Sequence, residues 1–253
     1  MCTLALYFQE FKDYPLIVAA NRDEYFSRPS ADPQVLVEKP LVLGGKDLLA
    51  GGTWLGVNEY GFLAGILNRK ADREGLVAAR SRGLLCLDIL RLKDPTEACL
   101  FLQREKGSSY LPFNLLFINE KEGFVAYNIK DQIKYLRLEK GLHVLSNTVV
   151  YDADSEKMQH AYLLFSGVKK SLTGEKNNLN SWIPLLRAAL CDHSLAANSN
   201  EPKAAICLHT ESYGTVSSSI IFYASQEKRF YSFYTSGPPC CEAYGPSLAV
   251  KVV

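Results

Sequence analysis

The order in which strand-like runs and helical patterns follow one another is the feature that most restricts the fold of this chain. Short apolar runs at residues 3–9 and 16–20 come first, and the segment TWLGVNEYGFLAGILN adds two more. Two helical patterns, four further strand-like runs, two more helical patterns and a last pair of strands complete the order. Clustered strands with segregated helices predict an α+β fold. We expect a four-layer αββα sandwich, in which two mostly antiparallel sheets pack face to face between helical layers.

The individual elements have recognisable boundaries. Helical patterns are predicted at residues 82–92, from Asp94 onward, at 154–169 and at 180–192. The helix that follows Asp94 has the clearest start, since Asp94 suits the N-cap, Pro95 the first helical position and Glu97 the third. The middle strands are FNLLFIN, GFVAYNI, IKYLRLE and GLHVLSN, and the last pair is SSSIIFYA and RFYSFYT. Nothing within residues 1–192 reads as a linker, so we expect one domain over 1–253 with an irregular tail from about residue 237.

Composition excludes several classes of function. Of the 253 residues 47% are hydrophobic, and 28 basic and 27 acidic residues give a net charge of +1. That balance does not predict a nucleic-acid partner. No apolar run approaches the roughly 20 residues of a transmembrane helix, and no basic stretch with a cleavage site marks a signal peptide. We therefore expect a soluble, cytoplasmic protein.

Seven cysteines are present, an odd number without a C-x-x-C pair, so neither a disulfide framework nor a structural zinc site is expected. Four of them lie in apolar stretches and are expected to be ordinary core residues: Cys86, Cys99, Cys191 and Cys207. Cys240 and Cys241 are adjacent, and neighbouring residues of a strand point to opposite faces. The sequence therefore predicts no metal site.

The first hairpin places a cysteine near a polar stretch. Cys2 precedes the first strand, and Asn21-Arg22-Asp23-Glu24 follows the second. If residues 11–14 form the loop, paired positions sum to 25 and Cys2 lies opposite Asp23. Asn21 and Asp23 then share the face of Cys2, and Arg22 points away. A slip of one residue would exchange these faces.

This arrangement permits a specific chemistry. Removal of Met1 would leave Cys2 with a thiol and a free α-amine, which is a nucleophile with its own base. Asp23 could orient the ammonium group, and an arginine could favour the thiolate. The alternative is that Cys2 stands at position 2 by chance and that the charged stretch is a solvated loop.

Longer motifs carry a family resemblance. VAANRDEYFSRP and GGKDLLAGGTWLGVNEYG, followed by RSRGLL, PFNLLF, GLHVLSNT and SYGTVSSSIIF, resemble the NRDE family of transport and Golgi organization protein 2-like proteins over nearly the whole chain. That family is distantly similar to the N-terminal cysteine hydrolases. The resemblance implies an N-terminal-nucleophile hydrolase fold of αββα type. It also implies that a cysteine nucleophile attacks a carbon–nitrogen amide bond without a required cofactor.

The resemblance assigns roles to residues of this chain. Cys2 would be the nucleophile, Asp23 would hold the ammonium, and Asn68 and Asn147 would stabilise the oxyanion. Asn21, Arg22 and Glu24 are candidate substrate-binding residues. His143 is a further candidate on its position alone, since period-2 alternation puts it on the strand face of Asn147; the alternative is an ordinary core or surface histidine. Two departures stand out. The hydrolases place their arginine three residues before the aspartate, whereas Arg22 and Asp23 are adjacent. Family members commonly have arginine where this chain has Val216.

Two functions follow from these observations. The first is an amidohydrolase-like enzyme that acts on a small acylated molecule. The alternative is non-enzymatic handling of a hydrophobic ligand, either haem or a lipid or acyl-coenzyme A, as the eukaryotic family members suggest. Any haem would be bound non-covalently, because the chain has no C-x-x-C-H motif. The two readings differ in whether Cys2 has a free amine and a reactive thiol.

Overall fold

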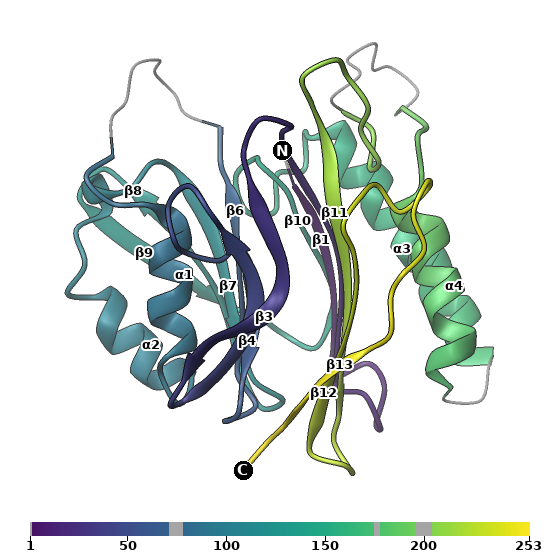
Figure 1. Ribbon diagram of the computed structural model, residues 1–253, viewed down its shortest axis with the longest axis horizontal. Coiled ribbons are helices and arrows are strands. Elements are labelled where there is room, and N and C mark those ends of the chain that lie inside the picture. The colour runs from purple at the N-terminus through teal and green to yellow at the C-terminus, as the bar shows by residue number, and fades with distance from the viewer. Residues whose placement is uncertain (1, 71–77, 175–177, 196–203) are drawn as a thin grey trace.

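Two antiparallel sheets form the centre of the molecule. The computed structural model describes residues 2–70, 78–174, 178–195 and 204–253 (Figure 1). The first sheet has the strand order β10 (Gly141–Leu145), β1 (Thr3–Phe8), β2 (Leu16–Tyr25), β11 (Tyr213–Ala224), β12 (Arg229–Thr235) and β13 (Leu248–Lys251). The second sheet runs β3 (Ser30–Glu38), β4 (Leu41–Asp47), β5 (Leu55–Asn58), β6 (Leu63–Asn68), β7 (Phe113–Ile118), β8 (Gly123–Ile129) and β9 (Gln132–Arg137).

The sheets face each other, and helices cover their outer faces (Figure 1). The helices are α1 (Arg82–Leu90) and α2 (Pro95–Leu102) on the second sheet, and α3 (Glu156–Gly174) and α4 (Leu179–Leu190) on the first. A short 3₁₀ helix, η1 (Gly107–Ser109), precedes β7. The predicted αββα sandwich is thus confirmed. None of the helices in the described ranges is long and apolar enough to cross a membrane.

Three apolar layers hold this architecture together. Leu6 and Val18 of the first sheet pack with Leu63 and Leu116 of the second, which shows that strand faces turned toward each other are apolar. Trp182 of α4 lies in a second cluster against the outer face of the first sheet. A third cluster joins α1 and α2 to the outer face of the second sheet. Burial of apolar area in all three layers supplies the main driving force for folding.

The predicted start of α2 is confirmed. Asp94 Oδ1 accepts a hydrogen bond from the Glu97 backbone N–H at 3.0 Å, and Glu97 Oε2 accepts one from the Lys93 N–H at 2.8 Å. Pro95 occupies the first turn, where its missing N–H has no helical partner to lose.

The predicted register of the first hairpin is wrong by one residue. Thr3 pairs with Asn21, so paired positions sum to 24 rather than 25. The Gln9 backbone N–H donates to the Pro15 carbonyl at 2.7 Å, with Gln9 at a φ of 55°. The loop therefore contains five residues, 10–14, instead of four. Cys2 consequently comes opposite Arg22, the exchange of faces that a one-residue slip produces.

Other boundaries also differ from the prediction. The polar stretch Asn21–Glu24 lies inside β2, which continues to Tyr25 because β11 pairs with it along that length. The segment after it forms the β3–β4 hairpin, which the sequence did not reveal. Irregular register between residues 31 and 34 accommodates Pro33, since proline in sheets is confined to edges and bulges. The tail expected to be irregular ends in the short strand β13.

Candidate active site

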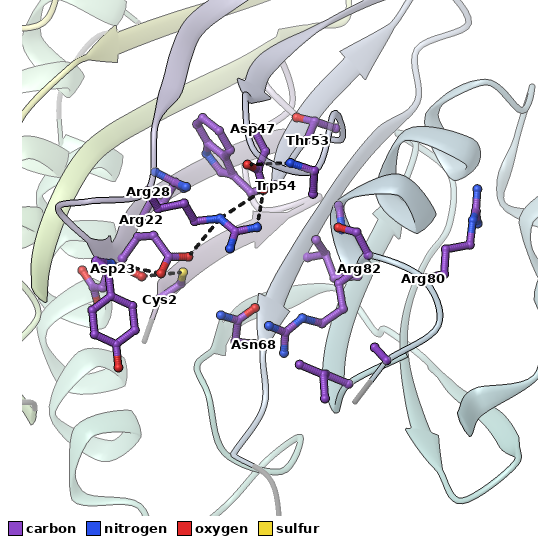
Figure 2. A pocket seen from close by; sticks show the side chains of 18 residues that line it. Cys2, Arg22, Asp23, Arg28, Asp47, Thr53, Trp54, Asn68, Arg80 and Arg82 are labelled. Atoms are coloured by element: carbon purple, nitrogen blue, oxygen red, sulfur yellow. Dashed lines mark hydrogen bonds and ion pairs between the residues drawn. The ribbon is translucent and has the colours of Figure 1, made fainter. Parts of the chain in front are cut away.

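A cavity of about 370 Å³ opens between the two sheets, at the end where β1 begins and β6 ends (Figure 2). Its wall on the first sheet contains Cys2 and the Arg22–Glu24 part of β2. The second sheet and the start of α1 form the opposite wall, where Asn68 and Arg82 lie across from Cys2 (Figure 2). The cavity therefore joins residues that are far apart in the sequence.

Cys2 is half-buried at the edge of this cavity. Its Sγ lies 4.0 Å from the Asp23 carbonyl oxygen, to which the thiol donates a long hydrogen bond. Burial is the main cause that raises the pKa of the Cys2 thiol, and the Asp23 charge also raises it, whereas the hydrogen bond to the Asp23 backbone and the charge of Arg22 lower it less. No histidine is among the residues described as lining the cavity. The Cys2 thiol thus has no imidazole beside it among the described lining residues.

Asp23 is buried and held by two side chains from other elements. Its Oδ1 accepts a hydrogen bond from Thr215 Oγ1 of β11 at 2.7 Å. Its Oδ2 lies 3.8 Å from Nζ of Lys157 on α3, whose side chain is only 6% exposed. Burial raises the pKa of Asp23, while the charge of Lys157 acts in the opposite direction. Asp23 therefore has a buried cationic partner although position 216 carries no arginine.

Arg22 lies on the inner side of the strand with Cys2, as the corrected register requires. Its guanidinium carbon is 4.3 Å from the centre of the Trp54 ring, and Nη1 donates to Ser30 Oγ at 3.3 Å. The stacking fixes the orientation of the guanidinium without neutralising its charge. Among the described residues, no carboxylate forms an ion pair with Arg22.

The cavity's other acidic residues are engaged by Arg28. Arg28 Nη2 lies 2.6 Å from Asp47 Oδ2, and its Nε lies 3.8 Å from Glu24 Oε2. Asp47 also accepts the backbone N–H of Leu49 at 3.0 Å, which shapes the turn after β4. Arg28 thus engages both of these carboxylates, and Arg22, which is itself buried, lines the cavity without an ion pair among the described residues.

Arg82 supplies a second cation on the far wall. It is the first residue of α1, where the Ser81 N-cap oxygen accepts the Gly83 N–H at 3.2 Å. Arg82 Nη1 donates to the Pro112 carbonyl at 3.0 Å, and burial lowers the pKa of its guanidinium. No ion pair of Arg82 with a carboxylate occurs in the part of the chain that the structure describes.

A close backbone contact positions this wall. A Cβ atom on Gly52 would lie 2.1 Å from the Gly83 carbonyl carbon, so only glycine permits the approach. The Thr53 backbone N–H then donates to the Gly83 carbonyl oxygen at 3.0 Å. The segment before Trp54 is thereby attached to the start of α1.

Comparison with known proteins identifies the family of this chain. Residues 1–233 match the family model described as Transport and Golgi organisation 2. The chain belongs to this family. The Transport and Golgi organization protein 2 homolog of Homo sapiens is 29% identical over 226 residues, and the homolog of Mus musculus is 28% identical over 226 residues. Each alignment covers 82% of this chain and 82% of the relative.

Solved structures share the fold of this family member. A mutant conjugated bile acid hydrolase from Clostridium perfringens has a TM-score of 0.57 at 12% identity, covering 99% of this chain and 92% of that chain. The Caenorhabditis elegans ortholog of N-acylethanolamine-hydrolyzing acid amidase has a TM-score of 0.52 at 12% identity, covering 87% and 92%. The expected N-terminal-nucleophile hydrolase fold is therefore confirmed. At such identities the likeness shows the fold alone.

The structure places five of the eight candidate site residues in the wall of the cavity: Cys2, Arg22, Asp23, Glu24 and Asn68. Asn21 is instead buried on the helical side, where Nδ2 donates to the carbonyls of Leu190 at 2.8 Å and Ile206 at 3.0 Å. Its role here is to attach α4 and the segment before β11 to the sheet.

Two residues predicted to share the cavity lie elsewhere. Asn147 is not among its lining residues, and its side-chain oxygen accepts a hydrogen bond from Ser146 Oγ at 3.1 Å. His143 lines a separate cavity of about 420 Å³ beside α3. Both of its ring nitrogens have partners, the Tyr151 hydroxyl at 3.0 Å and the Glu139 carbonyl at 2.7 Å.

Several cavity residues were not predicted from the sequence. Arg82 lies within RSRGLL, a segment that was quoted only for the family resemblance and as the start of a helix. Trp54, Arg28 and Asp47 come from segments whose pairing depends on the unexpected β3–β4 hairpin. Lys157 comes from a helix with no local signal of a functional role. Only the tertiary fold brings these side chains to Cys2 and Asp23.

Proposed function

We propose that this protein hydrolyses an amide bond of a small acylated molecule, with Cys2 as an N-terminal nucleophile exposed by removal of Met1. The observation that carries the proposal is the Cys2 thiol in the wall of a 370 Å³ cavity that has an amide donor and cations on its other side. The absence of histidine among the described lining residues fits a mechanism in which the α-amine of Cys2 is the base.

The reaction would proceed in two steps. The Cys2 α-amine takes the thiol proton, and Sγ forms a bond to the substrate carbonyl carbon. The carbon–nitrogen bond then breaks, and the amine product leaves with the proton from the α-ammonium. Water, deprotonated by the same amine, attacks the thioester carbon and releases a carboxylic acid and the free thiol. No cofactor takes part in either step.

The cavity residues have distinct roles in this proposal. The Asn68 side-chain amide would donate to the developing oxyanion, an interaction typically worth several kcal/mol in the transition state. Asp23, fixed by Thr215 and Lys157, would hold the α-ammonium of processed Cys2. The proposal gives Asn147 no role, because Asn147 is not among the described residues that line the cavity.

The charge of the cavity indicates the substrate class. Arg22 and Arg82 face the cavity from opposite walls, and neither forms an ion pair with a carboxylate in the described chain. A guanidinium in such surroundings binds carboxylate or phosphate oxygens well. We therefore propose that the substrate carries an anionic group besides the amide, as an N-acyl amino acid does.

The first experiment combines intact mass with thiol labelling. Protein purified from its native host should lack Met1, and an electrophilic thiol probe near neutral pH should label Cys2 faster than the other cysteines. Cys99→Ser is the matched control, because Cys99 is also half-buried and burial raises its pKa to about 11. Retained Met1 together with an inert Cys2 would exclude the mechanism.

A second test addresses the anionic group. N-acyl amino acids should be hydrolysed faster than the corresponding methyl esters, which keep the amide but lose the charge. Arg82→Met should raise KM for the charged substrates and reduce this preference, while affecting the esters little. Equal rates for acids and esters would exclude a role for the arginines in selecting substrate.

The non-enzymatic alternative has its own supporting observation. The second cavity is lined mainly by apolar side chains, among them Leu142, Met158 and Leu163. An acyl chain fits these surroundings better than haem, because both nitrogens of His143 are already hydrogen-bonded. Displacement of a fluorescent fatty acid tests this function. Binding that is lost in Leu163→Asp and kept in Cys2→Ala would support a carrier, and absence of binding would exclude it.

A further inference from the structure

Four residues with nitrogen and sulfur donor atoms gather outside the set that lines the Cys2 cavity. The potential donor atoms of His193, Cys207, His209 and Cys240 all lie within 4.8 Å of one another. They come from three segments: the exit from α4, the approach to β11 and the turn after β12. Cys207 was expected to be an ordinary core residue, and the sequence predicted no metal site. The structure instead brings together two imidazoles and two thiols.

Three of the six distances among these donor atoms are close to those of a tetrahedral site. Zinc bonds of about 2.3 Å to sulfur and 2.0–2.1 Å to nitrogen require tetrahedral edges of about 3.8 Å between two sulfurs and about 3.6 Å between sulfur and nitrogen. The Sγ atoms of Cys207 and Cys240 are 3.6 Å apart. His209 Nε2 lies 3.7 Å from Cys207 Sγ and 3.3 Å from Cys240 Sγ. Three edges of the tetrahedron are thus already close to the required lengths.

His193 is oriented as metal-binding histidines usually are. Its Nδ1 lies 3.1 Å from the Cys207 carbonyl oxygen, so the Nδ1–H donates and Nε2 keeps its lone pair for a metal. Histidine ligands commonly donate the second ring N–H to a carbonyl or carboxylate in this way. The ring centres of His193 and His209 are 5.1 Å apart, so the two imidazoles are direct neighbours.

Backbone contacts hold the three segments in position. The Cys207 N–H donates to the Asp192 carbonyl at 2.8 Å, directly after α4. The Thr215 N–H donates to the Leu208 carbonyl at 2.8 Å, which attaches the Cys207–His209 segment to β11. Arg187 of α4 donates from Nε to the Pro239 carbonyl at 2.9 Å, next to Cys240. The ligands therefore belong to a scaffold whose backbone hydrogen bonds do not themselves require a metal.

We propose that His193, Cys207, His209 and Cys240 bind one Zn²⁺ ion as a tetrahedral structural site. Binding releases the two thiol protons to solvent, and two thiolates with two neutral imidazoles balance the charge of the ion. Four protein ligands leave no open position, which is typical of structural rather than catalytic zinc. The ion would join the end of α4, the start of β11 and the turn after β12.

The neighbouring Cys241 offers a natural control. Its Sγ lies 3.6 Å from Cys240 Sγ, yet it is exposed and does not belong to the group of four. Zinc in a tetrahedral site made by the four residues should not bind Cys241 Sγ, whereas zinc that binds adventitiously to surface thiols should bind it. Cys241→Ser thus distinguishes the two.

The test uses the full chain, purified under reducing conditions with zinc supplied during expression. Native mass spectrometry and elemental analysis should find one zinc per chain. After exchange, Co²⁺ should give the intense ligand-field bands of a tetrahedral site and thiolate-to-cobalt charge transfer. Cys207→Ser and Cys240→Ser should lose at least about tenfold in zinc affinity, whereas Cys241→Ser and Cys99→Ser should bind as the unmodified protein does.

Zinc content and the cobalt spectrum of the unmodified protein are sufficient to disprove the proposal, so the test does not depend on whether a variant folds. Absence of zinc after dialysis against a weak chelator, or an octahedral cobalt spectrum, would exclude the site. A Cys207–Cys240 disulfide that persists in reductant would also exclude it, as would equal zinc binding by folded Cys240→Ser. None of these results depends on hydrolysis at Cys2.

Discussion

The two thiol sites of this molecule differ in what surrounds the sulfur. Cys2 stands alone at a cavity between the sheets, with arginines and an asparagine around it but no histidine among the described lining residues. Cys207 and Cys240 lie beside the end of α4 and meet two imidazoles at close range. A nucleophile needs room for a substrate, whereas a structural metal needs its ligands to close around it. The environment, and not the residue type, therefore indicates the chemistry of each cysteine.

The polar residues of β2 connect these two sites. Asn21 donates to the Ile206 carbonyl at 3.0 Å, one residue before Cys207. Asp23 accepts from Thr215 Oγ1 at 2.7 Å, and Thr215 Oγ1 accepts the Leu208 N–H at 2.9 Å. Within Asn21–Glu24, Arg22 thus lines the cavity, whereas Asn21 supports the segment that contains Cys207.

The largest expected effect separates the sites directly. Cys2→Ala should reduce amide hydrolysis by at least about 1000-fold, because removal of a nucleophile leaves only binding and oxyanion stabilisation. The same variant should retain one zinc per chain, since Cys2 belongs to a different cavity. Rates on an N-acyl amino acid and elemental analysis are measured on one preparation. Loss of zinc in folded Cys2→Ala would show that the two regions are not independent.

The next largest effect concerns the buried ion pair behind Cys2. Lys157→Met should lower the free energy of unfolding by about 3–5 kcal/mol, because it removes the buried cation that lies 3.8 Å from the Asp23 carboxylate. Asp23→Asn combined with Lys157→Met should recover much of that loss, since both charges are then gone. Urea unfolding of the two single variants and the double variant gives the coupling energy. Additive effects would contradict a direct Asp23–Lys157 interaction.

The sequence allowed the layers to be predicted, but not the details that assemble the sites. Alternating and apolar runs were sufficient to predict the sandwich, and the N-cap residue Asp94 was sufficient to predict the start of α2. The hairpin register failed because a fifth loop residue, reached through positive φ at Gln9, cannot be distinguished from a four-residue loop by hydrophobic pattern. The β3–β4 hairpin was missed because Pro33 interrupts its strand pattern and a bulge accommodates it.

The two sites were predictable to different degrees. Cys2 and Asp23 could be found because they lie near each other along one hairpin and match family motifs. The zinc ligands could not, because they are spread from residue 193 to residue 240 without a short repeating spacing. They come close together only because the fold brings the end of α4, the segment before β11 and the turn after β12 next to one another. This proximity is a property of the topology and not of local sequence. Lys157 and Arg82 were missed for the same reason.

A smaller effect tests the connection through Asn21. Asn21→Ala removes two hydrogen bonds from its side-chain amide to buried carbonyls and should cost about 1–3 kcal/mol in the free energy of unfolding. It should also weaken zinc binding, because the Ile206 carbonyl that it holds directly precedes Cys207. The control is Asn68→Ala in the cavity, which should lower kcat with little change in zinc affinity or stability. Unchanged zinc affinity in Asn21→Ala would show that the metal-site segment is held without β2.

The smallest effect is a pH dependence that tests how burial and the ion pair balance at Asp23. Burial raises the pKa of this carboxyl above its ordinary value, even though Lys157 opposes the shift. A folded-state pKa that is raised means that the native state binds the proton more tightly than the unfolded chain does. Relative to Asp23→Asn, the stability contribution of Asp23 should therefore be fully present below the unfolded pKa of about 3.9 and be lost as the pH rises through the folded value. Urea unfolding of the unmodified protein and of Asp23→Asn at several pH values measures this contribution. On acidification, the free energy of unfolding of the unmodified protein should rise relative to that of Asp23→Asn. A shift in favour of Asp23→Asn would mean that the attraction of Lys157 outweighs burial, and that the carboxylate behind Cys2 is held in its charged form.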